Sequence, residues 1–284
     1  MANIRLIKGR IKTAKNIAQI TKAMELVAAS KMKKAQAEAL AGRVYAGKIH
    51  EMVHSLAART DSKHHPLLTP PRSDAGKLLV ILVSTNKGLA GGLNTNLFRY
   101  LMKTETADAG HEYITLGKKG ADFLVRIGRE VVADFSDTTP WVSAVPPVIE
   151  LATGKFLSGT CRRVDIVYSD FISALIQVPT RKTVLPLSLA KVESQAVRPA
   201  DIEIEPSVEE VFSTLLPHYI ENQLRDAVLE AEASEHSARM IAMRNATDNA
   251  VSLMQELTLV YNKARQEKIT YEITDMITAR LAVS

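Results

Sequence analysis

The sequence has very little cysteine, few aromatic residues and no long apolar run. Cys161 is its single cysteine, which excludes a disulfide framework and a thiolate metal cluster and fits a reducing compartment. Apolar runs such as residues 78–83 are far shorter than the roughly 20 residues that a membrane-spanning helix needs. The basic start of the chain also lacks the uninterrupted apolar segment of a signal peptide. We therefore expect a chain that does not insert directly into a membrane.

Proline is missing from both ends of the sequence, and glycine is rare in the first end and absent from the last. All 11 prolines lie between Pro66 and Pro217, and no glycine follows Gly159. Residues 1–65 contain three glycines and no proline, and residues 218–284 contain neither. Ordinary helices average roughly 11–12 residues, so two ends of this length with so few breakers predict two very long helices. The sequence thus divides into an N-terminal helix in residues 1–60, a central domain in residues 75–190 and a C-terminal helix in residues 206–284.

Charge is divided in the same way. Residues 1–58 carry 11 lysines and arginines against three glutamates, whereas residues 206–284 carry 7 basic and 12 acidic side chains. The overall net charge of +5 therefore conceals a basic helix and an acidic helix. Since both helices join the central domain at their inner ends, we expect an antiparallel pair with opposite charges side by side.

Apolar spacing predicts where the two helices touch. In the first helix a stripe of isoleucines continues, shifted round the helix, along a second set of apolar residues; the full stripe is Ile4, Ile7, Ile11, Ile17, Ile20, Met24 and Val27. In the last helix, spacings of four and three form a coiled-coil seam: Ala246, Ala250, Leu253, Leu257, Val260 and Ala264. At 1.5 Å per residue the last helix is about 30 Å longer than its partner. Its end, about residues 262–281, carries apolar side chains that need a socket in another chain.

The central region reads as an α/β domain. Strands are predicted at residues 78–84, 113–116, 131–134 and 165–169, with a further one at 183–187, and helices at 93–102, 121–127 and 147–158. This alternation predicts a small, mostly parallel, Rossmann-like sheet.

One short motif suggests a zinc peptidase. His50, Glu51 and His54 match H-E-x-x-H, which places two imidazoles one helical turn apart beside a glutamate. The residues that follow offer no third ligand, and the helix has little from which to build a substrate cleft. Solvated residues near the end of a helix are the favoured interpretation, and the zinc peptidase is kept as an alternative.

Two further features suggest binding to phosphates. The glycine-rich turn at residues 86–94 follows a strand and precedes a helix, but it matches neither phosphate-binding glycine motif. The basic first helix suggests a coiled-coil nucleic-acid scaffold, although its basic residues are not interleaved with aromatic ones. A tight turn and a face that meets acidic protein are favoured, so we expect no cofactor, no catalytic residue, no bound metal and no nucleic acid.

Both ends of the chain resemble one family. The segment ITKAMELVAASKMKKAQ at residues 20–36 is similar to the opening helix of the gamma subunit of F-type, rotary ATP synthases. SEHSARMIAMRNATDNA at 234–250 and LTLVYNKARQEKITYEI at 257–273 are similar to the closing helix, and VSTNKGLAGGLNTN at 83–96 is similar to the strand–turn–helix of that family. The matching residues begin near residue 4, so we expect no transit peptide and a bacterial chain.

The resemblance implies a function without bond chemistry. A gamma subunit is similar to an axle: its helices lie within a ring of three alpha and three beta subunits, and its foot binds epsilon and the c-ring, with delta in the same soluble sector. Rotation of the ring driven by protons is coupled to ATP synthesis at the beta subunits. The resemblance places such a chain peripherally on the cytoplasmic side of the bacterial plasma membrane.

Individual residues follow from the matching motifs. The resemblance implies beta-subunit contacts at Met24, Lys31, Arg239, Arg265, Gln266, Thr270 and Glu272. It implies a bearing tip formed by Ile273, Met276, Ile277 and Leu281. It implies that the foot contacts the c-ring or epsilon through Ile202, Glu203 and Glu205.

Overall fold

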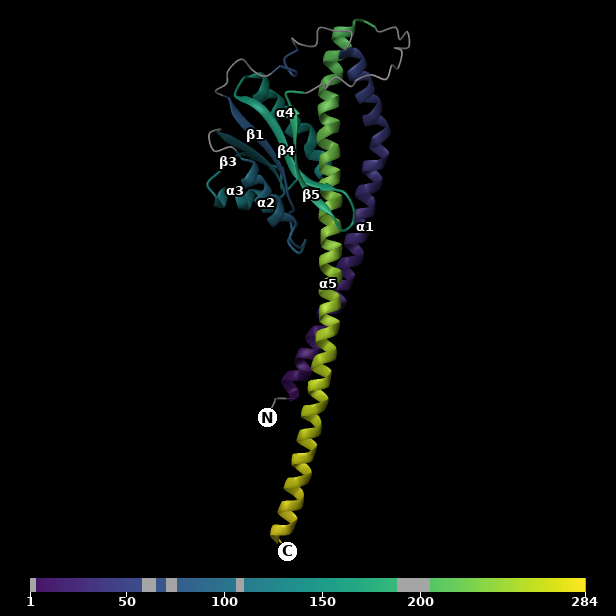
Figure 1. Ribbon diagram of the computed structural model, residues 1–284, viewed down its shortest axis with the longest axis vertical. Coiled ribbons are helices and arrows are strands. Elements are labelled where there is room, and N and C mark those ends of the chain that lie inside the picture. The colour runs from purple at the N-terminus through teal and green to yellow at the C-terminus, as the bar shows by residue number, and fades with distance from the viewer. Residues whose placement is uncertain (1–3, 58–64, 70–75, 106–109, 188–204, 284) are drawn as a thin grey trace. The chain divides into compact units, whose positions relative to one another are not determined.

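The computed structural model describes residues 4–57, 65–69, 76–105, 110–187 and 205–283. Two long helices dominate it: α1 (Ile4–Ala57), drawn in purple and blue in Figure 1, and α5 (Val208–Val283), drawn in green to yellow. The scarcity of proline and glycine in these two segments predicts both helices. Helix α5 begins at Val208, before the proline-free segment at residues 218–284, so it contains Pro217 near its start.

Strands and helices alternate between the two long helices. Their order is β1 (Lys77–Val83), α2 (Leu93–Thr104), β2 (His111–Leu116), α3 (Lys118–Arg126), β3 (Glu130–Asp134), the 3-10 helix η2 (Trp141–Ala144), α4 (Val145–Leu157), β4 (Cys161–Phe171) and β5 (Gln177–Leu185). The expected α/β class is confirmed. Strand β5 begins six residues earlier than expected, because its first part is half-exposed and shows no apolar signal. Helix η2 carries no pattern that predicts it.

The five strands form one mixed sheet in the order β3-β2-β1-β4-β5. Strands β2, β1 and β4 run parallel, as does β3, and β5 is antiparallel to β4. From β1 the chain builds the sheet outward through β2 and β3, and it then returns to add β4 on the other side of β1. The strand order therefore reverses between β1 and β4.

Both faces of the sheet are covered. Leu79, Ile81 and Val83 of β1 face a large core to which α4, the end of α1 and the start of α5 contribute. Val80 and Leu82 face a smaller core against α2 and α3. Alternate residues of β1 thus point to opposite layers, which explains why this strand is apolar at every position after Lys77.

The chain divides into two compact units. One contains residues 1–29 and 239–284 and is called the helical unit here; the other contains residues 30–238 and is called the α/β unit. Helices α1 and α5 each contribute a segment to both units. The boundaries of the three segments read from the sequence stay a prediction.

Candidate partner-binding surfaces

The residues of the zinc-like motif have other partners. His50 Nδ1 lies 3.1 Å from the Tyr219 hydroxyl, and Glu51 accepts a hydrogen bond from Lys48 Nζ at 2.7 Å. Burial lowers the pKa of His54, and the neighbouring His50 lowers it further. Within the described ranges, no group of three or more His, Cys, Asp or Glu side chains is placed to hold a metal ion. The geometry therefore gives no support to a zinc peptidase.

The glycine-rich turn after β1 uses its polar groups on itself and on neighbouring loops. The Thr85 hydroxyl donates to Lys87 O at 2.8 Å, and it accepts a hydrogen bond from Asn94 Nδ2 at 2.7 Å. The side chain of Asn86 donates to Ser136 O and accepts from the backbone N–H of Lys118, both at 2.9 Å. These bonds tie the turn to the segments that follow β2 and β3, so the turn holds the sheet end together.

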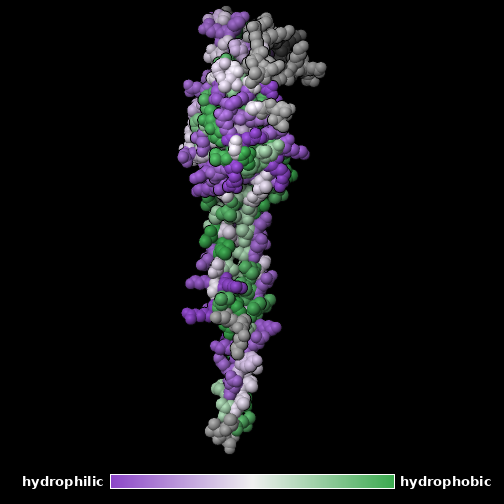
Figure 2. All heavy atoms as spheres, turned by 90° about the vertical axis from the view of Figure 1, so that its left-hand side faces the viewer, coloured by the Kyte–Doolittle hydropathy of each residue, from purple (hydrophilic) through white to green (hydrophobic). Residues whose placement is uncertain are grey.

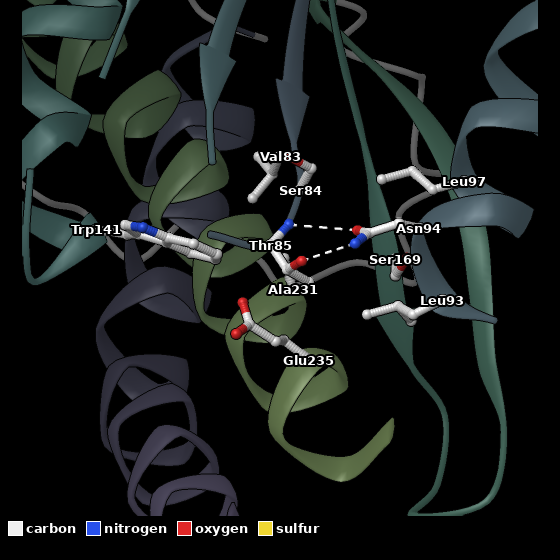
Figure 3. Close-up of a pocket in the computed structure, with 10 residues that line it drawn as sticks. All are labelled: Val83, Ser84, Thr85, Leu93, Asn94, Leu97, Trp141, Ser169, Ala231 and Glu235. Atoms are coloured by element: carbon white, nitrogen blue, oxygen red, sulfur yellow. Dashed lines mark hydrogen bonds between the residues drawn. The ribbon is translucent and has the colours of Figure 1, made fainter. Parts of the chain in front are cut away.

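The end of β1 also marks the place where α/β domains usually bind ligands. In open sheets the binding crevice lies beyond the carboxyl ends of the strands, at the point where the strand order reverses. Here that place is filled from α5: Figure 3 shows Ala231 of this helix next to Thr85, and Glu235, one turn further on, with its carboxylate turned toward the side of Trp141. The pocket that remains has room for about one water molecule, far below the roughly 300 Å³ of a ligand site. The crevice is therefore closed to a nucleotide by the chain's own helix.

In the helical unit, the contact line of α1 begins with an isoleucine and continues with small residues. Its buried positions recur every seven residues: Ile7, Ala14, Thr21 and Ala28. The predicted continuation through Ile17, Ile20 and Val27 is wrong, because all three side chains are exposed, and Met24 is only half-buried. Side chains as small as Ala let two helix backbones approach closely, so after Ile7 the contact follows the small residues, and Ile17 and Ile20 turn outward.

The contact line of α5 in the same unit is partly as predicted. Met243, Ala250 and Ala264 are buried, so the predicted seam positions Ala250 and Ala264 are confirmed. Leu253 and Val260 are exposed and do not belong to the seam. Their places are taken one residue later by the half-buried side chains of Met254 and Tyr261. The alternating spacing of three and four residues is retained, but every second seam position lies one residue later than predicted.

A polar layer joins the two helices of this unit. The hydroxyls of Thr21 and Thr247 lie 2.7 Å apart. Each hydroxyl also lies within hydrogen-bond distance of a carbonyl one turn back in its own helix: Thr21 of Ile17 O at 2.9 Å and Thr247 of Met243 O at 2.9 Å. A single hydrogen-bonded polar pair in an apolar seam favours one register over its neighbours.

In the α/β unit the two long helices bring opposite charges together. Lys31 and Lys34 of α1 lie near Glu232 of α5, and Arg43 lies near Asp226. Burial raises the pKa of Glu232, and these lysines act in the opposite direction. Residue numbers rise along α1 as they fall along α5, so this pair is antiparallel. The expected alignment of a basic with an acidic helix is confirmed here.

The end of α5 has no cover in the described part of the chain. Ala264 is its last buried residue, and every described side chain from Arg265 to Leu281 is exposed. Hydrophobic side chains, green in Figure 2, reach the surface along the helices. Those at the tip include the four residues assigned to a bearing: Ile273, Met276, Ile277 and Leu281. The predicted unpaired end of α5 is confirmed.

The remaining residues assigned by resemblance lie as follows. Lys31, Arg265, Gln266, Thr270 and Glu272 are exposed, and Arg239 and Met24 are half-buried. Glu272 forms an ion pair with Lys268, 3.4 Å away. Glu205 is exposed, whereas Ile202 and Glu203 lie outside the described residues.

Sequence reasoning missed a surface. Ile17, Ile20 and Val27, with half-buried Met24, form an exposed apolar stripe on α1, which is called the outer stripe here. Ala14, Thr21 and Ala28 recur every seven residues, but Ile17, Ile20 and Val27 also recur at helical spacing, so spacing alone does not tell which line faces outward.

Comparisons with known proteins match the whole chain. A family model described as ATP synthase matches residues 3–283. A curated ATP synthase gamma chain of Opitutus terrae is 42% identical over 300 residues, and that of Roseiflexus castenholzii is 40% identical over 291; each match covers all of this chain and at least 99% of the relative. A chain in the structure of the Euglena gracilis mitochondrial ATP synthase (OSCP/F1/c-ring, rotational state 3) aligns with a TM-score of 0.67 at 21% identity, over 99% of this chain and 94% of that one. That likeness concerns the fold. No helix among the described residues has both the length and the apolarity that crossing a membrane requires.

Proposed function

The chain belongs to the ATP synthase gamma-chain family and is a non-catalytic, central-stalk subunit of an F-type ATP synthase, and we propose that its residues couple rotation of a c-ring to ATP synthesis through the surfaces described above. The observation that carries this proposal is the exposed apolar end of α5, which extends past the last buried seam residue, Ala264. Relatives of this length and identity give no support to a peptidase or a nucleic-acid scaffold.

Torque needs one continuous, well-anchored element. Helix α5 is unbroken from Val208 to Val283. Its first turns are anchored in the large core through Phe212, Leu216 and Ile220, each at most 1% exposed. Turning the α/β unit therefore acts on the same helix that carries the tip. The closed crevice fits this role, because α5 fills the place where an enzyme of this fold would hold its substrate.

The contacts with beta subunits are proposed along α5 and α1. Arg239, Arg265, Gln266, Thr270 and Glu272 offer polar groups on α5. Met24 and Lys31 offer an apolar and a basic contact on α1, suited to an acidic loop of a beta subunit. The outer stripe adds apolar area beside Met24, and we include Ile17, Ile20 and Val27 in this surface.

The two ends of the rotor have different proposed partners. At the tip, Ile273, Met276, Ile277 and Leu281 would turn inside an apolar sleeve of the alpha and beta subunits, because exposed apolar side chains gain stability when another chain covers them. At the foot, Glu205 with Ile202 and Glu203 would face the c-ring and epsilon. The chain would then act peripherally, on the cytoplasmic side of a bacterial plasma membrane.

The test is reconstitution with a hexamer of alpha and beta subunits. The purified chain alone should lack ATPase activity, and with the hexamer it should rotate when ATP is added, as seen by single-molecule tracking of a probe on the α/β unit. Changing Ile17, Ile20 and Val27 together to Asn should weaken binding to the hexamer. Val125→Asn, at an equally exposed apolar position on α3, should leave binding unchanged. If a hexamer without the chain synthesised ATP at the full rate on the membrane sector, the proposal would fail.

A further inference from the structure

The turn between β4 and β5 carries exposed apolar side chains at a place where polar residues are usual. These side chains are 43–76% exposed and lie within seven residues: Ile172, Leu175, Ile176 and Val178. Residues 172–178 are called the hairpin tip here, and the sequence has no charged residue from Phe171 to Thr180. Single exposed apolar side chains are ordinary on a protein surface, whereas a group of them marks a surface that another chain covers.

Hydrogen bonds fix the shape of the hairpin tip. The backbone N–H of Ser173 donates to Ile176 O at 3.1 Å, and that of Ile176 donates to Ser173 O at 3.2 Å. Ser173 Oγ accepts from the N–H groups of Leu175 and Ile176, at 3.3 and 3.1 Å. The Gln177 side chain donates to the carbonyl oxygens of Ser173 and Ala174, at 3.2 and 3.1 Å. Since these polar groups bond to one another, a partner would meet mainly apolar side chains on a preformed loop, at a small cost in conformational entropy.

The hairpin is attached to α5 at two levels. Ser237 Oγ, on a residue that is 0% exposed, donates to Ala174 O at 2.6 Å. Seven residues earlier on α5, about two helical turns, Glu230 accepts a hydrogen bond from the Tyr168 hydroxyl at 3.0 Å. Figure 1 shows β4 and β5 running beside α5. The hairpin tip is therefore held in place on α5 and must turn with it.

The hairpin tip is attached where α5 passes from one unit to the other. Ser237 is the last residue but one of the α/β unit, and Arg239 begins the segment of α5 in the helical unit. Arg239 is also the first of the proposed contacts with beta subunits on α5. A hexamer that encloses α5 from Arg239 onward would have its rim at the level of Ser237. Along α5, the tip is therefore continuous with the surface proposed to meet the hexamer.

We propose that the hairpin tip is a second bearing surface, which slides against an apolar part of the rim of the hexamer of alpha and beta subunits; this rests on the central-stalk function proposed above. Apolar attraction is non-directional, so successive subunits can pass an uncharged tip without forming and breaking an ion pair at each one. The competing occupant is a subunit that turns with the chain, such as epsilon, which would cover the tip permanently.

The test is photo-crosslinking from the hairpin tip in the assembled complex. Cys161 is the only cysteine of the sequence and is 0% exposed, so Leu175→Cys supplies a single exposed thiol for a benzophenone maleimide. After assembly with alpha, beta and epsilon subunits and illumination, we expect a covalent link to alpha or beta, identified by mass spectrometry, and an arrest of ATP-driven rotation. Val125→Cys, on α3 and 68% exposed, is the matched control, and its label should form no link to alpha or beta and leave rotation unchanged.

A further variant measures the apolar contact itself. Leu175→Asn combined with Ile176→Asn should bind the hexamer about tenfold more weakly than the unmodified chain, because both variants lose apolar area that the hexamer would cover. Both side chains are exposed, so the fold should be retained, which far-UV circular dichroism checks. Val125→Asn should bind the hexamer as the unmodified chain does.

Two results would overturn the inference. One is a link from the labelled Leu175→Cys chain to epsilon or the c-ring alone, with rotation continuing after illumination, since the tip would then be covered by a part that turns with the chain. The other is the absence of any link to alpha or beta in a complex that rotates. An unmodified chain that neither binds the hexamer nor turns within it would instead contradict the central-stalk function itself, so the two failures are distinguishable.

Discussion

Two substitutions in α1, one in the outer stripe and one in the buried line, test which line of residues pairs with α5. Ile20 is 60% exposed, whereas Ala28 is 2% exposed, and both lie in the helical unit. In the structure, changing Ile20 to Asn removes only the buried two-fifths of an isoleucine side chain. Full burial of such a side chain stabilises a protein by about 1.5–3 kcal/mol, so the expected loss is about 1 kcal/mol or less.

Ala28→Leu is expected to lower the stability of the chain more than Ile20→Asn does. It adds three carbons where the two helix backbones approach closely, and overpacking of this kind costs about 1–3 kcal/mol. If the line of isoleucines were the seam instead, the order would be reversed. Ile20→Asn would then bury an amide and lose a full apolar side chain, at a cost of about 3 kcal/mol or more.

Hydrogen exchange of the α1 amides around residues 14–28 measures this local stability directly. Far-UV circular dichroism on heating provides the global comparison. The expected result is faster exchange in Ala28→Leu than in Ile20→Asn, with the latter close to the unmodified chain. The reverse order would refute the assignment of the seam to Ala14, Thr21 and Ala28.

Three further predictions concern the turn, the polar layer and the carboxylates of α5. Gly117→Ala should destabilise the chain by about 3 kcal/mol or more, because φ is +108° and a Cβ would lie 2.0 Å from Ser84 O. Gly154→Ala, in an open helical position, should instead stabilise it by about 0.5–1 kcal/mol. Denaturant unfolding measures both, and equal effects would contradict the turn geometry. Thr21→Val and Thr247→Val should each lower the stability of the chain by about 1 kcal/mol. The double variant should lower it by less than the sum, because each single change already removes the same hydrogen bond. Simple additivity in thermal unfolding would exclude this hydrogen bond. Burial raises the pKa of Glu230 above its ordinary 4.5, so its contribution to stability is present below that pH and is lost as the pH rises through the pKa in the folded state. Glu230→Gln should therefore raise the melting temperature near pH 7 and have little effect near pH 4; a stabilising effect confined to low pH would contradict the burial of this carboxylate.

Much of the fold could be predicted because local chemistry decides it. The absence of proline from both ends, with few glycines in the first and none in the last, predicts long helices, and the alternation of apolar runs with turns predicts the sheet. The exposed end of α5 also follows from length alone, given 1.5 Å per residue. The first half of β5 was missed because its side chains are half-exposed, and an apolar pattern appears only at its buried end.

The candidate surfaces could be predicted in part. The difference in charge between the two ends correctly predicts that α1 lies beside α5 with opposite charges facing, as Lys31 and Lys34 do with Glu232. The outer stripe could not be recognised from spacing, since its isoleucines repeat with the same period as the true contact line. The closing of the crevice by Ala231 and Glu235 has no local signal, because these residues are more than 130 positions away from the β1 turn.

The sequence by itself determined the kinds of element, their lengths, their charges and the membership of the chain in its family, because each depends on residues close together or on a long continuous match. Tertiary structure alone decided which of two parallel lines on α1 is buried. The period of a helix places both lines on the surface with equal regularity, and only close approach of the two backbones favours Ala14, Thr21 and Ala28 over Ile17, Ile20 and Val27. It also decided that an α/β crevice holds a helix instead of a ligand, since that result depends on where α5 packs against the end of the sheet.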